Sequence, residues 1–516
     1  MLAATWSTSA PGAERKVVVP TAQDGGATWR YTTKAPGEGW TSRSFDATAW
    51  RRGRAGFGVK DRVTLAETIG TAWRSPEIYL RKEVVLPARS VFRTVALTIR
   101  HDEDVEVYLN GRVIFAASGY NTRWTAYDVT EEVGLALVTG RNVLAVHVSQ
   151  SSGGQYIDVG LELDPKQRLH RRADLAAFRL AKRLRGLRWT AEKAWAWHER
   201  MGPIRGCNYL PRTAVNSTEM WQTETFDAKT IKQELSWARR AGYNNVRVFL
   251  QYVVWRDDAN GLRQRFDRFL AIAAANEIGV MPILFCDCAF AGREPYVGRQ
   301  DPPVPGVHNS GWVPSPGLKR VVDRSAWPEL ERYVKDFVGR FGRDPRVRIW
   351  DLYNEPGNSG LGNKSLPLVL AAVGWARETE PAQPITIGAW TSFGSVLSKR
   401  LMELSDVVSF HGYDSPEAVA GTVRRCASYH RPVVCTEWLH RQSGNTFRSV
   451  LPVFAKHRVG WYHWGLVAGR TQTYMPWGSK KGDPMPKIWQ HDVFHASGKP
   501  YDAEELKLLR AFRYGE

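Results

Sequence analysis

Cysteine is scarce in this chain, and its few occurrences form no metal or redox pattern. The 516 residues include five cysteines, an odd number, and their spacing fits no zinc motif. Cys286 and Cys288 are one residue apart, so on a strand both point to one face, which suits neither a mutual disulfide nor a CxxC redox pair. We interpret the whole set as buried structural residues: Cys207, Cys286, Cys288, Cys426 and Cys435.

Long apolar runs are also missing. No stretch approaches the roughly 20 apolar residues of a membrane helix, so no membrane insertion is expected. The first residues, Met1-Leu-Ala-Ala-Thr-Trp, have no basic region followed by an apolar one, so no signal peptide is predicted. No His, Asp and Glu residues stand at metal-ligand spacing, and no glycine-rich phosphate loop joins a strand to a helix. Neither a metal nor a cofactor is therefore predicted.

Basic residues outnumber acidic ones in this chain. The net charge is +19, which is compatible with a partner that is nucleic acid, a membrane surface or an anionic substrate. Much of the excess lies between residues 166 and 188, where only Asp174 opposes it. The basic residues there are Lys166, Arg168, Arg171, Arg172, Arg179, Lys182, Arg183, Arg185 and Arg188. This segment is interpreted as a solvated basic helix, with contact to an anionic polymer as the alternative.

Residues 16–164 have the pattern of an antiparallel β-sandwich. Short runs with period-two alternation recur between turn signals, as in 77–85, 95–100, 105–109 and 142–148. Asn110-Gly111 is typical of a tight hairpin turn between two of these strands. Residues 165–202 become helical and basic, and they are predicted to be a linker that packs on the outside of the next domain.

From residue 203 to residue 516, buried strands alternate with amphipathic helices. Several strands are continuous apolar runs, as expected for parallel strands covered on both faces. The predicted strands are 204–209, 245–251, 280–286, 347–353, 384–388, 406–411, 432–437 and 459–464. The predicted helices are 226–241, 262–277, 326–341, 365–380, 394–404, 415–428, 445–456 and 502–513, with Asp227 as an N-cap. Eight such units predict a (β/α)8 barrel, so the fold class is a β-sandwich followed by a TIM barrel.

Two glutamates follow the fourth and seventh predicted barrel strands. The fourth strand runs into Asn354-Glu355-Pro356, and the seventh ends at Glu437. Because the carboxyl ends of all barrel strands meet at one rim, the two side chains should face the same cleft. Two carboxyls across a cleft are what cleavage of a glycosidic bond requires, one to hold a proton and one to attack or to activate water. Separately, each glutamate could equally be a solvated rim residue.

In the barrel, this combination resembles glycoside hydrolase family 5, within the clan of retaining (β/α)8 enzymes. Seven of the eight recurring site residues of that family have a counterpart here, in the same order along the chain. They are Arg247 in Asn-Val-Arg-Val-Phe, Asn354 and Glu355, His411 and Tyr413 in Phe-His-Gly-Tyr, Glu437, and Trp464 in Trp-Tyr-His-Trp-Gly. The resemblance implies that Glu355 is the acid/base and Glu437 the nucleophile.

The resemblance also implies roles for the supporting residues. Arg247 and Tyr413 are expected to hydrogen-bond Glu437 and keep it ionised. Asn354 is expected to bind a substrate 2-hydroxyl, and Trp464 to offer a flat face to a sugar ring. The alternatives are a structural ion pair for Arg247, a satisfied buried polar group for His411, and core packing for Trp464.

One family position departs from the pattern. Where the family has a histidine after the third strand, this chain has Cys286-Asp287-Cys288, and Asp287 is the predicted replacement. Weaker candidates for sugar platforms are Trp390, Trp477, and Trp312 in the long loop 288–325; core or surface packing is at least as well supported for each of these three.

The N-terminal sandwich resembles the sugar-binding-like domain of glycoside hydrolase family 2. The resemblance rests on Trp73-Arg-Ser-Pro-Glu-Ile-Tyr-Leu, on His101-Asp-Glu-Asp-Val-Glu-Val-Tyr-Leu-Asn-Gly, and on Arg141-Asn-Val-Leu-Ala-Val. The immunoglobulin-like middle domain usual in that family is missing. The predicted architecture is therefore a hybrid of two glycosidase types.

Together these observations predict a retaining β-glycosidase that acts on poly- or oligosaccharides through a covalent glycosyl-enzyme. The alternative is a non-catalytic carbohydrate-binding protein on a decayed barrel. A basic nucleic-acid-binding protein is disfavoured, because no nucleic-acid motif is present and aromatic residues do not interleave with the basic run. The expected partner is a carbohydrate, with no nucleic acid; a polysaccharide substrate favours an extracellular or periplasmic location, and no oligomeric state is predicted.

Overall fold

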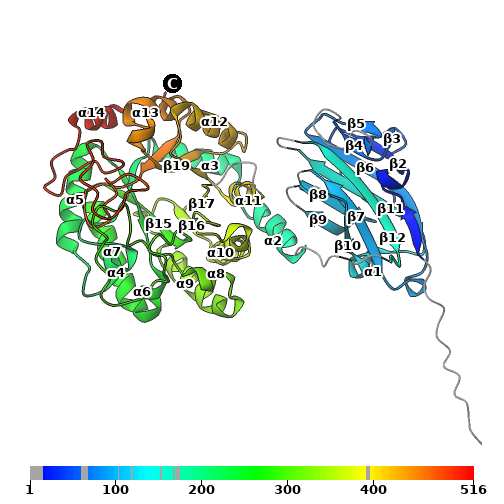
Figure 1. Ribbon diagram of the computed structural model, residues 1–516, viewed down its shortest axis with the longest axis horizontal. Coiled ribbons are helices and arrows are strands. Elements are labelled where there is room, and N and C mark those ends of the chain that lie inside the picture. Colours follow the sequence, from blue (N-terminus) through cyan, green and yellow to red (C-terminus); the bar gives the residue numbers. More distant parts are fainter. Residues whose placement is uncertain are drawn as a thin grey trace, which may run out of the picture. The chain divides into compact units, whose positions relative to one another are not determined.

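The computed structural model contains two compact units, Met1–Arg179 and Leu180–Glu516 (Figure 1). The division between them falls inside the predicted linker 165–202. The structure describes residues 15–59, 68–102, 104–117, 120–121, 123–150, 154–166, 169, 175–390 and 396–515.

The N-terminal unit is the predicted β-sandwich. Its described residues form two six-stranded sheets, antiparallel except for the short pair β4 and β5. One sheet has the order β10 (Thr125–Asp128), β7 (Val95–His101), β12 (Tyr156–Leu163), β4 (Phe57–Gly58) and β5 (Thr71–Ala72), and β1 (Lys16–Val19) also pairs with β12. The other has the order β3 (Arg51–Arg54), β2 (Thr28–Thr32), β6 (Glu77–Leu86), β11 (Gly140–Ser149), β8 (Asp104–Leu109) and β9 (Arg112–Ala117).

Alternation along these strands builds the sandwich core. In β6, Ile78 and Leu80 are buried in an apolar core that also includes Trp29 and Trp73, as expected when one face of each sheet is covered. The predicted hairpin turn joins β8 to β9, with Asn110 at φ 51° and Gly111 at φ 87°. Both values lie in the left-handed region that a two-residue hairpin turn requires, which explains the Asn-Gly sequence. The described residues of this unit also form α1 (Thr130–Ala136), η1 (Ala22–Asp24) and η4 (Arg89–Val91).

Two helices occupy most of the predicted linker. The first, α2 (Leu175–Gly186), carries the exposed side chains of Arg183 and Arg185, whereas Arg168, Arg171 and Arg172 lie outside the described residues. The second, α3 (Ala191–Met201), packs against the barrel. Its buried Trp197 joins an apolar cluster with residues near the amino ends of barrel strands, among them Ile204 and Tyr462.

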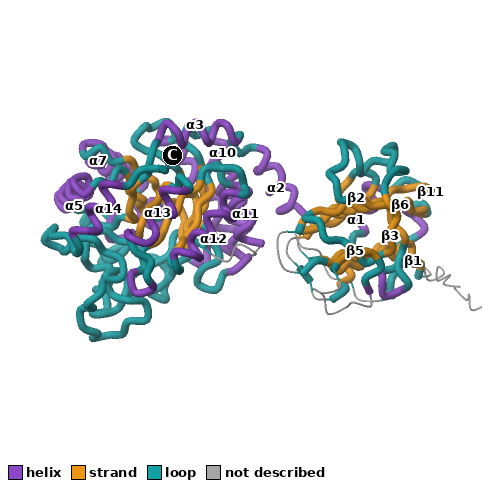
Figure 2. The backbone as a smooth tube through the Cα atoms, turned by 90° about the horizontal axis from the view of Figure 1, so that it is seen from above, coloured by secondary structure: helices purple, strands orange, loops and turns teal. Residues whose placement is uncertain are grey.

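The C-terminal unit is the predicted barrel, and all eight strands form where the sequence placed them. The parallel sheet has the order β17 (Ile385–Gly388), β16 (Trp350–Asn354), β15 (Gly279–Cys286), β14 (Asn245–Phe249), β13 (Arg205–Asn208), β20 (Gly460–His463), β19 (Val433–Trp438) and β18 (Val408–Gly412). A parallel bridge between Ala389 and Phe410 brings β17 and β18 together, which closes the barrel. Figure 2 shows the strands surrounded by helices.

The eight predicted helices are also present. They are α5 (Ala228–Ala241), α7 (Ala259–Ala275), α9 (Trp327–Phe341), α10 (Leu366–Glu378), α11 (Val396–Leu404), α12 (Pro416–Ala427), α13 (Phe447–Lys456) and α14 (Ala503–Ala511). Asp227 caps α5 as predicted, because its side chain accepts a hydrogen bond from the Thr230 backbone N–H. The loops add short pieces that the sequence pattern did not indicate: α4 (Ser217–Trp221), α6 (Tyr252–Asp257), α8 (Leu318–Val322), η5 (Arg324–Ala326), η6 (Gly362–Ser365) and η7 (Arg441–Ser443).

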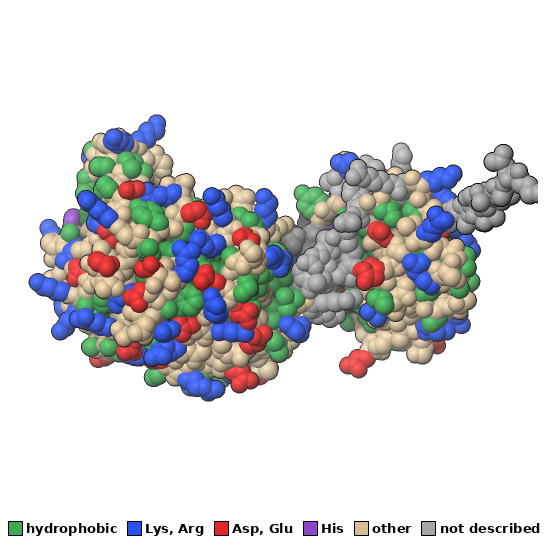
Figure 3. Space-filling model, turned by 90° about the horizontal axis from the view of Figure 1, so that it is seen from below, with side chains coloured by type: hydrophobic (Ala, Val, Ile, Leu, Met, Phe, Trp, Pro, Cys, Tyr) green, Lys and Arg blue, Asp and Glu red, His purple; other side chains and the backbone are tan. Residues whose placement is uncertain are grey.

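The surface of the barrel unit is mixed in charge. On the face seen in Figure 3, Lys and Arg side chains are interspersed with Asp and Glu rather than gathered in one stripe. Within the described part of the chain, no helix has the length and apolarity needed to span a membrane.

Candidate active site

A cleft of about 560 Å³ opens at the carboxyl ends of the barrel strands. Nine of the eleven predicted site residues line it: Trp312, Asn354, Glu355, Trp390, His411, Tyr413, Glu437, Trp464 and Trp477. The other lining residues are Cys288, Phe290, His308, Asn309, Asn358, Asp414, Gly478 and His491. Of the remaining predicted residues, Arg247 lies behind the carboxylates, and Asp287 points elsewhere.

Glu437, in β19, is held by a donor at each carboxylate oxygen. The Arg247 guanidinium donates to Oε1 at 2.9 Å, and the Tyr413 hydroxyl donates to Oε2 at 2.9 Å. Glu437 is 5% exposed, so these bonds lie in a nearly dry environment, where a charge-assisted hydrogen bond is strong. Both contacts are those expected from the sequence, and they fix the orientation of the carboxylate.

Glu355 immediately follows β16 and has an unusual backbone. Its φ of 49° is left-handed, which is strained for a residue with a side chain and which turns this side chain into the cleft. One oxygen, Oε1, lies 2.7 Å from His411 Nδ1. The other accepts hydrogen bonds from Cys288 Sγ at 3.1 Å and from Asn358 Nδ2 at 2.5 Å.

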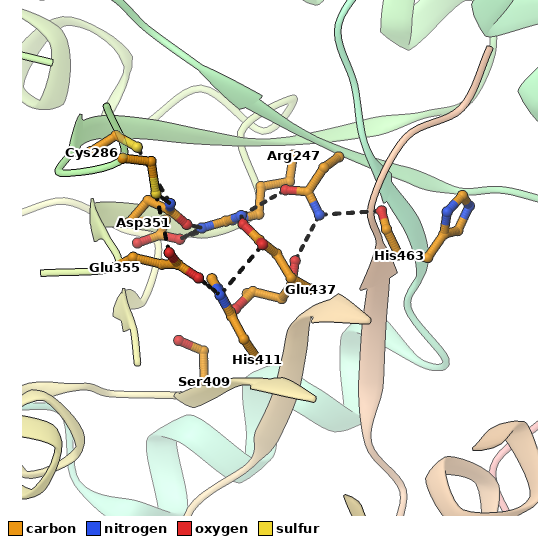
Figure 4. A network of polar contacts seen from close by, with 12 residues as sticks. Arg247, Cys286, Asp351, Glu355, Ser409, His411, Glu437 and His463 are labelled. Carbon is orange, nitrogen blue, oxygen red and sulfur yellow. Dashed lines mark hydrogen bonds and ion pairs between the residues drawn. The ribbon is translucent and has the colours of Figure 1, made fainter. Parts of the chain in front are cut away.

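The two carboxylates face each other across the ring of His411 (Figure 4). His411 Nδ1 is also 3.4 Å from Glu437 Oε2, and one side-chain atom from each of the three residues lies within 4.8 Å of the others. His411 Nε2 has no hydrogen-bond partner among the described residues. We therefore assign the proton of the neutral ring to Nδ1, which can donate it toward both carboxylates, so that no N–H is left unpaired at Nε2. Such a cluster could also hold a metal ion, a grouping that the sequence spacing did not indicate.

Arg247, in β14, organises the floor beneath this pair. Its fully buried guanidinium donates to Asp351 at 2.7 Å, to Asn208 at 2.6 Å and to Asn354 at 2.5 Å, in addition to Glu437. The chain provides room for this arrangement at Gly388. A side-chain Cβ there would lie 3.2 Å from an Arg247 nitrogen and 3.3 Å from His411 Nε2, closer than ordinary packing allows.

The pKa values of the two glutamates are shifted in opposite directions. Burial acts to raise the pKa of Glu355, but hydrogen bonds from His411, Cys288 and Asn358 outweigh it and lower the pKa. Burial raises the pKa of Glu437; His411 and Arg247 oppose this rise, whereas the nearby Glu355 carboxylate adds to it. Because one imidazole contacts both carboxyls, the two glutamates titrate as a pair. Their roles are therefore assigned from the orientation of each carboxylate and not from which of the two has the lower pKa without substrate.

Asp287 does not take the place of the family histidine, contrary to the sequence prediction. It is fully buried, and it accepts hydrogen bonds from the Tyr353 hydroxyl at 2.6 Å, the Gly357 backbone at 2.7 Å and the Ser365 hydroxyl at 2.5 Å. These contacts attach the end of β15 to the loop after β16. Burial raises its pKa to about 6. The neighbouring Cys288 instead reaches the cleft.

The aromatic residues form a floor and a rim. Trp464 packs edge-on against Phe249 and Trp312, with ring centroids 5.7 and 5.5 Å apart, so both tryptophans belong to the inner wall. Trp390 and Trp477 are 38% and 48% exposed and lie at the cleft surface. Trp477 packs against Tyr413, with ring centroids 4.9 Å apart, so Trp312, Trp464 and Trp477 combine cleft lining with aromatic packing. Trp390 is held by a bond from its indole N–H to the Pro356 carbonyl at 3.0 Å.

Sequence reasoning missed several polar residues of the site: Asn208, Cys288, Asp351, Asn358 and His491. A signal existed for Cys288, because the alternation that places Cys286 and Cys288 on one face also places Asp287 on the other. No such sequence signal existed for His491. The loop that carries His308 is joined to the segment after β20, as in the bond from its Nδ1 to Met475 O at 2.7 Å, and such long-range loop contacts leave no local pattern.

No protein-family model and no curated protein matches the chain. Solved structures with a similar fold include the β-glucuronidase of an uncultured Clostridium sp., with 12% identity, coverage of 99% of each chain and a TM-score of 0.37. The β-D-glucuronidase of Dictyoglomus thermophilum has 11% identity, covers 99% of this chain and 98% of its own, and has a TM-score of 0.37. The exo-β-1,4-mannosidase of Opitutaceae bacterium strain TAV5 has 16% identity, a TM-score of 0.44, and coverage of 60% of this chain and 59% of its own.

Proposed function

We propose that the protein is a retaining β-glycosidase, with Glu437 as nucleophile and Glu355 as acid/base. The observation that carries this proposal is the short distance between the two carboxylates, whose nearest atoms lie within 4.8 Å. Retaining glycosidases hold their carboxyl groups about 5–5.5 Å apart, whereas inverting enzymes need about 6.5–9.5 Å to admit a water molecule. The partners of Glu437 assign the roles, because two donors aim that carboxylate and favour its ionised form.

In the first step, Glu437 attacks the anomeric carbon and forms a covalent glycosyl ester, while the bond to the leaving oxygen breaks. Glu355 donates a proton to that oxygen, so the leaving group departs as an alcohol. In the second step, Glu355 takes a proton from water, the resulting hydroxide attacks the anomeric carbon, and the ester bond to Glu437 breaks. His411 contacts both carboxyls, so it is placed to redistribute the proton of the pair between the steps.

Asn354 and Trp464 are proposed to hold the sugar. Asn354 Oδ1 is occupied by Arg247, whereas among the described residues its amide group contacts only the sulfur atoms of Cys286 and Cys288, at 3.4 and 3.7 Å. Because sulfur is a weak acceptor, the amide is free to donate to a 2-hydroxyl, a contact that strengthens in the transition state. Trp464 supplies a flat apolar face below the ring.

The charge of the cleft favours an uncharged sugar. Its lining includes Glu355, Glu437 and Asp414, and none of the described lining residues is Lys or Arg. Burial lowers the pKa of His308 to about 4 and that of His491 well below its usual range, so both rings stay neutral. A carboxylated or sulfated sugar would therefore enter a negative field without a cationic partner. We propose neutral β-linked hexosides or pentosides as substrates, despite the positive net charge of the chain.

The direct test is turnover of a panel of aryl β-glycosides, namely glucoside, mannoside, galactoside, xyloside and, as the charged contrast, glucuronide. We expect activity on a neutral member, retention of anomeric configuration by NMR, and a loss of about 10⁴-fold or more in Glu355→Gln and Glu437→Gln. Asp257→Asn, at an exposed position remote from the cleft lining, is the matched control. Wild-type activity in either glutamate variant would overturn the assignment.

Azide separates the two roles. In Glu437→Gly, azide can replace the nucleophile and give an α-glycosyl azide in one displacement. In Glu355→Gly, the glycosyl-enzyme still forms from a substrate with a good leaving group, and azide then gives the β-anomer. The opposite pairing of variant and anomer would exchange the proposed roles of the two residues.

Two other functions have distinct outcomes. A carbohydrate-binding protein without activity would bind a panel sugar with unchanged affinity in Glu437→Gln and release no product. A metal-dependent enzyme using Glu355, His411 and Glu437 as ligands would lose activity with a chelator and regain it with the metal. We expect activity to be unaffected by chelation, because Arg247 and Tyr413 already occupy the Glu437 oxygens.

A further inference from the structure

Three arginines lie in register across β3, β2 and β6, which are neighbouring strands of the second sandwich sheet; the strands are labelled in Figure 1. Arg30 in β2 is the register partner of Arg52 in β3 on one side and of Arg81 in β6 on the other. Residues directly opposite on neighbouring strands have adjacent side chains, and like charges in such positions repel each other. Three adjacent cations are therefore an arrangement that folding alone does not favour.

The row lies in a cleft of about 510 Å³ on the outer face of this sheet. The cleft is walled by residues 43–48 of the segment before β3, which include Arg43 and Phe45. Its cationic lining residues are Arg30, Arg43, Arg52, Arg81, Lys82 and Arg141, and its anionic ones are Asp46 and Glu83. Cations thus outnumber anions by six to two, the reverse of the sign in the barrel cleft.

The cations inside the cleft are held by carbonyl oxygens rather than by carboxylates. Arg81, which is 5% exposed, donates to Trp40 O at 2.7 Å and to Phe45 O at 2.9 Å. Arg30 donates to Thr48 O at 2.8 Å, and Lys82 to Thr28 O at 3.0 Å. Carbonyl oxygens orient these side chains without neutralising them, and the carboxylates of Glu83 and Asp46 attract Arg81 and Arg30 only through space.

The two acids of the cleft are already engaged. Glu83 pairs with Arg141, and Asp46 accepts hydrogen bonds from Thr48, from the backbone at 2.8 Å and from the hydroxyl at 3.0 Å. The side chains of Arg43 and Arg52 are exposed and make no hydrogen bond or ion pair with the side chains or backbone that the structure describes. Among the described residues, the donors of these two guanidinium groups are therefore not used within the chain.

We propose that this cleft is a second binding site, which takes the carboxylate or sulfate groups of an acidic polysaccharide. A guanidinium group can bind two oxygens of a planar carboxylate, or two oxygens of a tetrahedral sulfate, through paired hydrogen bonds. A ligand with several anionic groups would neutralise the row, which accounts for the placement of three arginines in register. None of the described residues of the basic segment 166–188 lines this cleft.

The choice of a saccharide rests on the proposed function of the barrel, whereas the choice of an anion rests on the cleft itself. A recessed cleft of this volume admits sugar-sized groups one or two at a time. A nucleic-acid backbone instead needs an extended basic track along its phosphates. Nucleic acid is therefore the competing ligand in the test.

The test measures binding of the full chain to polygalacturonate and dextran sulfate, with neutral dextran and duplex DNA as contrasts. Titrations are made at about 20 mM and about 500 mM salt, because screening weakens such contacts. We expect binding of at least one acidic polysaccharide at low salt, weakened about tenfold in R43Q/R52Q. The control R93Q/R112Q removes the same charge from exposed positions of the same unit outside the cleft and should bind as the wild type does.

Binding equally weakened in both double variants would reduce the effect to net charge and overturn the proposal. So would tighter binding of DNA than of either polysaccharide, or no binding of either polysaccharide at low salt. The readout is independent of turnover, and Glu437→Gln should bind as the wild type does. Failure of the glycosidase assignment and failure of this site are therefore distinguishable.

Discussion

At the scale of single residues, the feature that governs the proposed chemistry is the ring of His411. Its Nδ1 lies 2.7 Å from Glu355 and 3.4 Å from Glu437. The sequence placed this histidine in the site but gave no indication that it would stand between the two carboxyls. That position depends on Gly388, which belongs to a different strand and leaves the space that the ring occupies.

Replacing His411 by Gln should move one limb of the pH profile in a known direction. The hydrogen bond from His411 lowers the pKa of Glu355, so its loss should raise that pKa. Glu355 then keeps its proton to higher pH, and the alkaline limb of kcat/KM moves upward. We expect kcat/KM itself to fall by about 10²-fold.

The comparison variant is Tyr413→Phe, which removes a hydrogen bond from Glu437 only. That bond acts to lower the pKa of Glu437, so its loss should move the acidic limb upward and leave the alkaline limb in place. An alkaline limb that stays fixed or moves down in His411→Gln would contradict the assigned hydrogen bond.

Cys288 should act as a hydrogen-bond donor and not as a nucleophile. A hydrogen bond with Cys286 and burial raise the pKa of its thiol well above the usual range, so it remains protonated. We expect Cys288→Ala to lower kcat/KM about tenfold and Cys288→Ser to restore most of it. Cys426→Ala, at a buried site in α12, should leave kcat/KM unchanged. Rapid inactivation of the wild type by iodoacetamide at neutral pH would show that the thiol is ionised.

At the scale of elements, the strands and helices follow from local sequence, and the loops do not. Continuous apolar runs and Asp227 located the barrel elements to within a few residues, because burial and capping are local requirements. The loop after β16 differs: it carries Asn358 to Glu355, and its position depends on Asp287, which is distant in sequence. Only the fold brings these partners together.

Asp287→Ala should loosen that loop and the fold around it. The substitution removes the acceptor of the Tyr353 and Ser365 hydroxyls, and it leaves the Gly357 N–H with only a 3.1 Å bond to Ser365 Oγ. We expect a loss of about 3 kcal/mol in the free energy of unfolding, together with lower kcat/KM, because Asn358 is no longer fixed. Urea unfolding checks the first and steady-state kinetics the second. Asp257→Ala should change neither, and an equally small effect in Asp287→Ala would contradict the anchoring role.

At the scale of the whole molecule, buried ionisable groups make stability depend on pH with opposite signs. Burial raises the pKa of Asp492 to about 7, above its ordinary 3.8. The folded chain thus holds a proton that the unfolded chain releases, so this contribution is complete below about pH 4 and is lost as pH rises through 7. Burial lowers the pKa of His463 from 6.5 to about 3, so its contribution is complete above pH 6.5 and is lost toward acid.

Asp492→Asn should remove the pH dependence of stability that Asp492 contributes. The variant keeps an acceptor for the Thr473 hydroxyl, which contacts both Asp492 oxygens at 2.9–3.0 Å. Relative to the wild type, its free energy of unfolding should improve by a few kcal/mol between about pH 4 and pH 8. Thermal unfolding across this range measures the difference. A difference that is constant with pH would mean that Asp492 does not titrate in this window.

The opposite signs of the two clefts have a consequence for behaviour in a gel or a cell wall. An acidic matrix would retain the protein through its sandwich, while the negative barrel cleft keeps the same acidic chains from acting as inhibitors. The sandwich would then control how long the protein stays in the matrix, and the barrel cleft would control the cleavage of glycosidic bonds. Salt in the surroundings would set how far the molecule migrates before release, and the rate at which it cuts the neutral chains around it would stay the same.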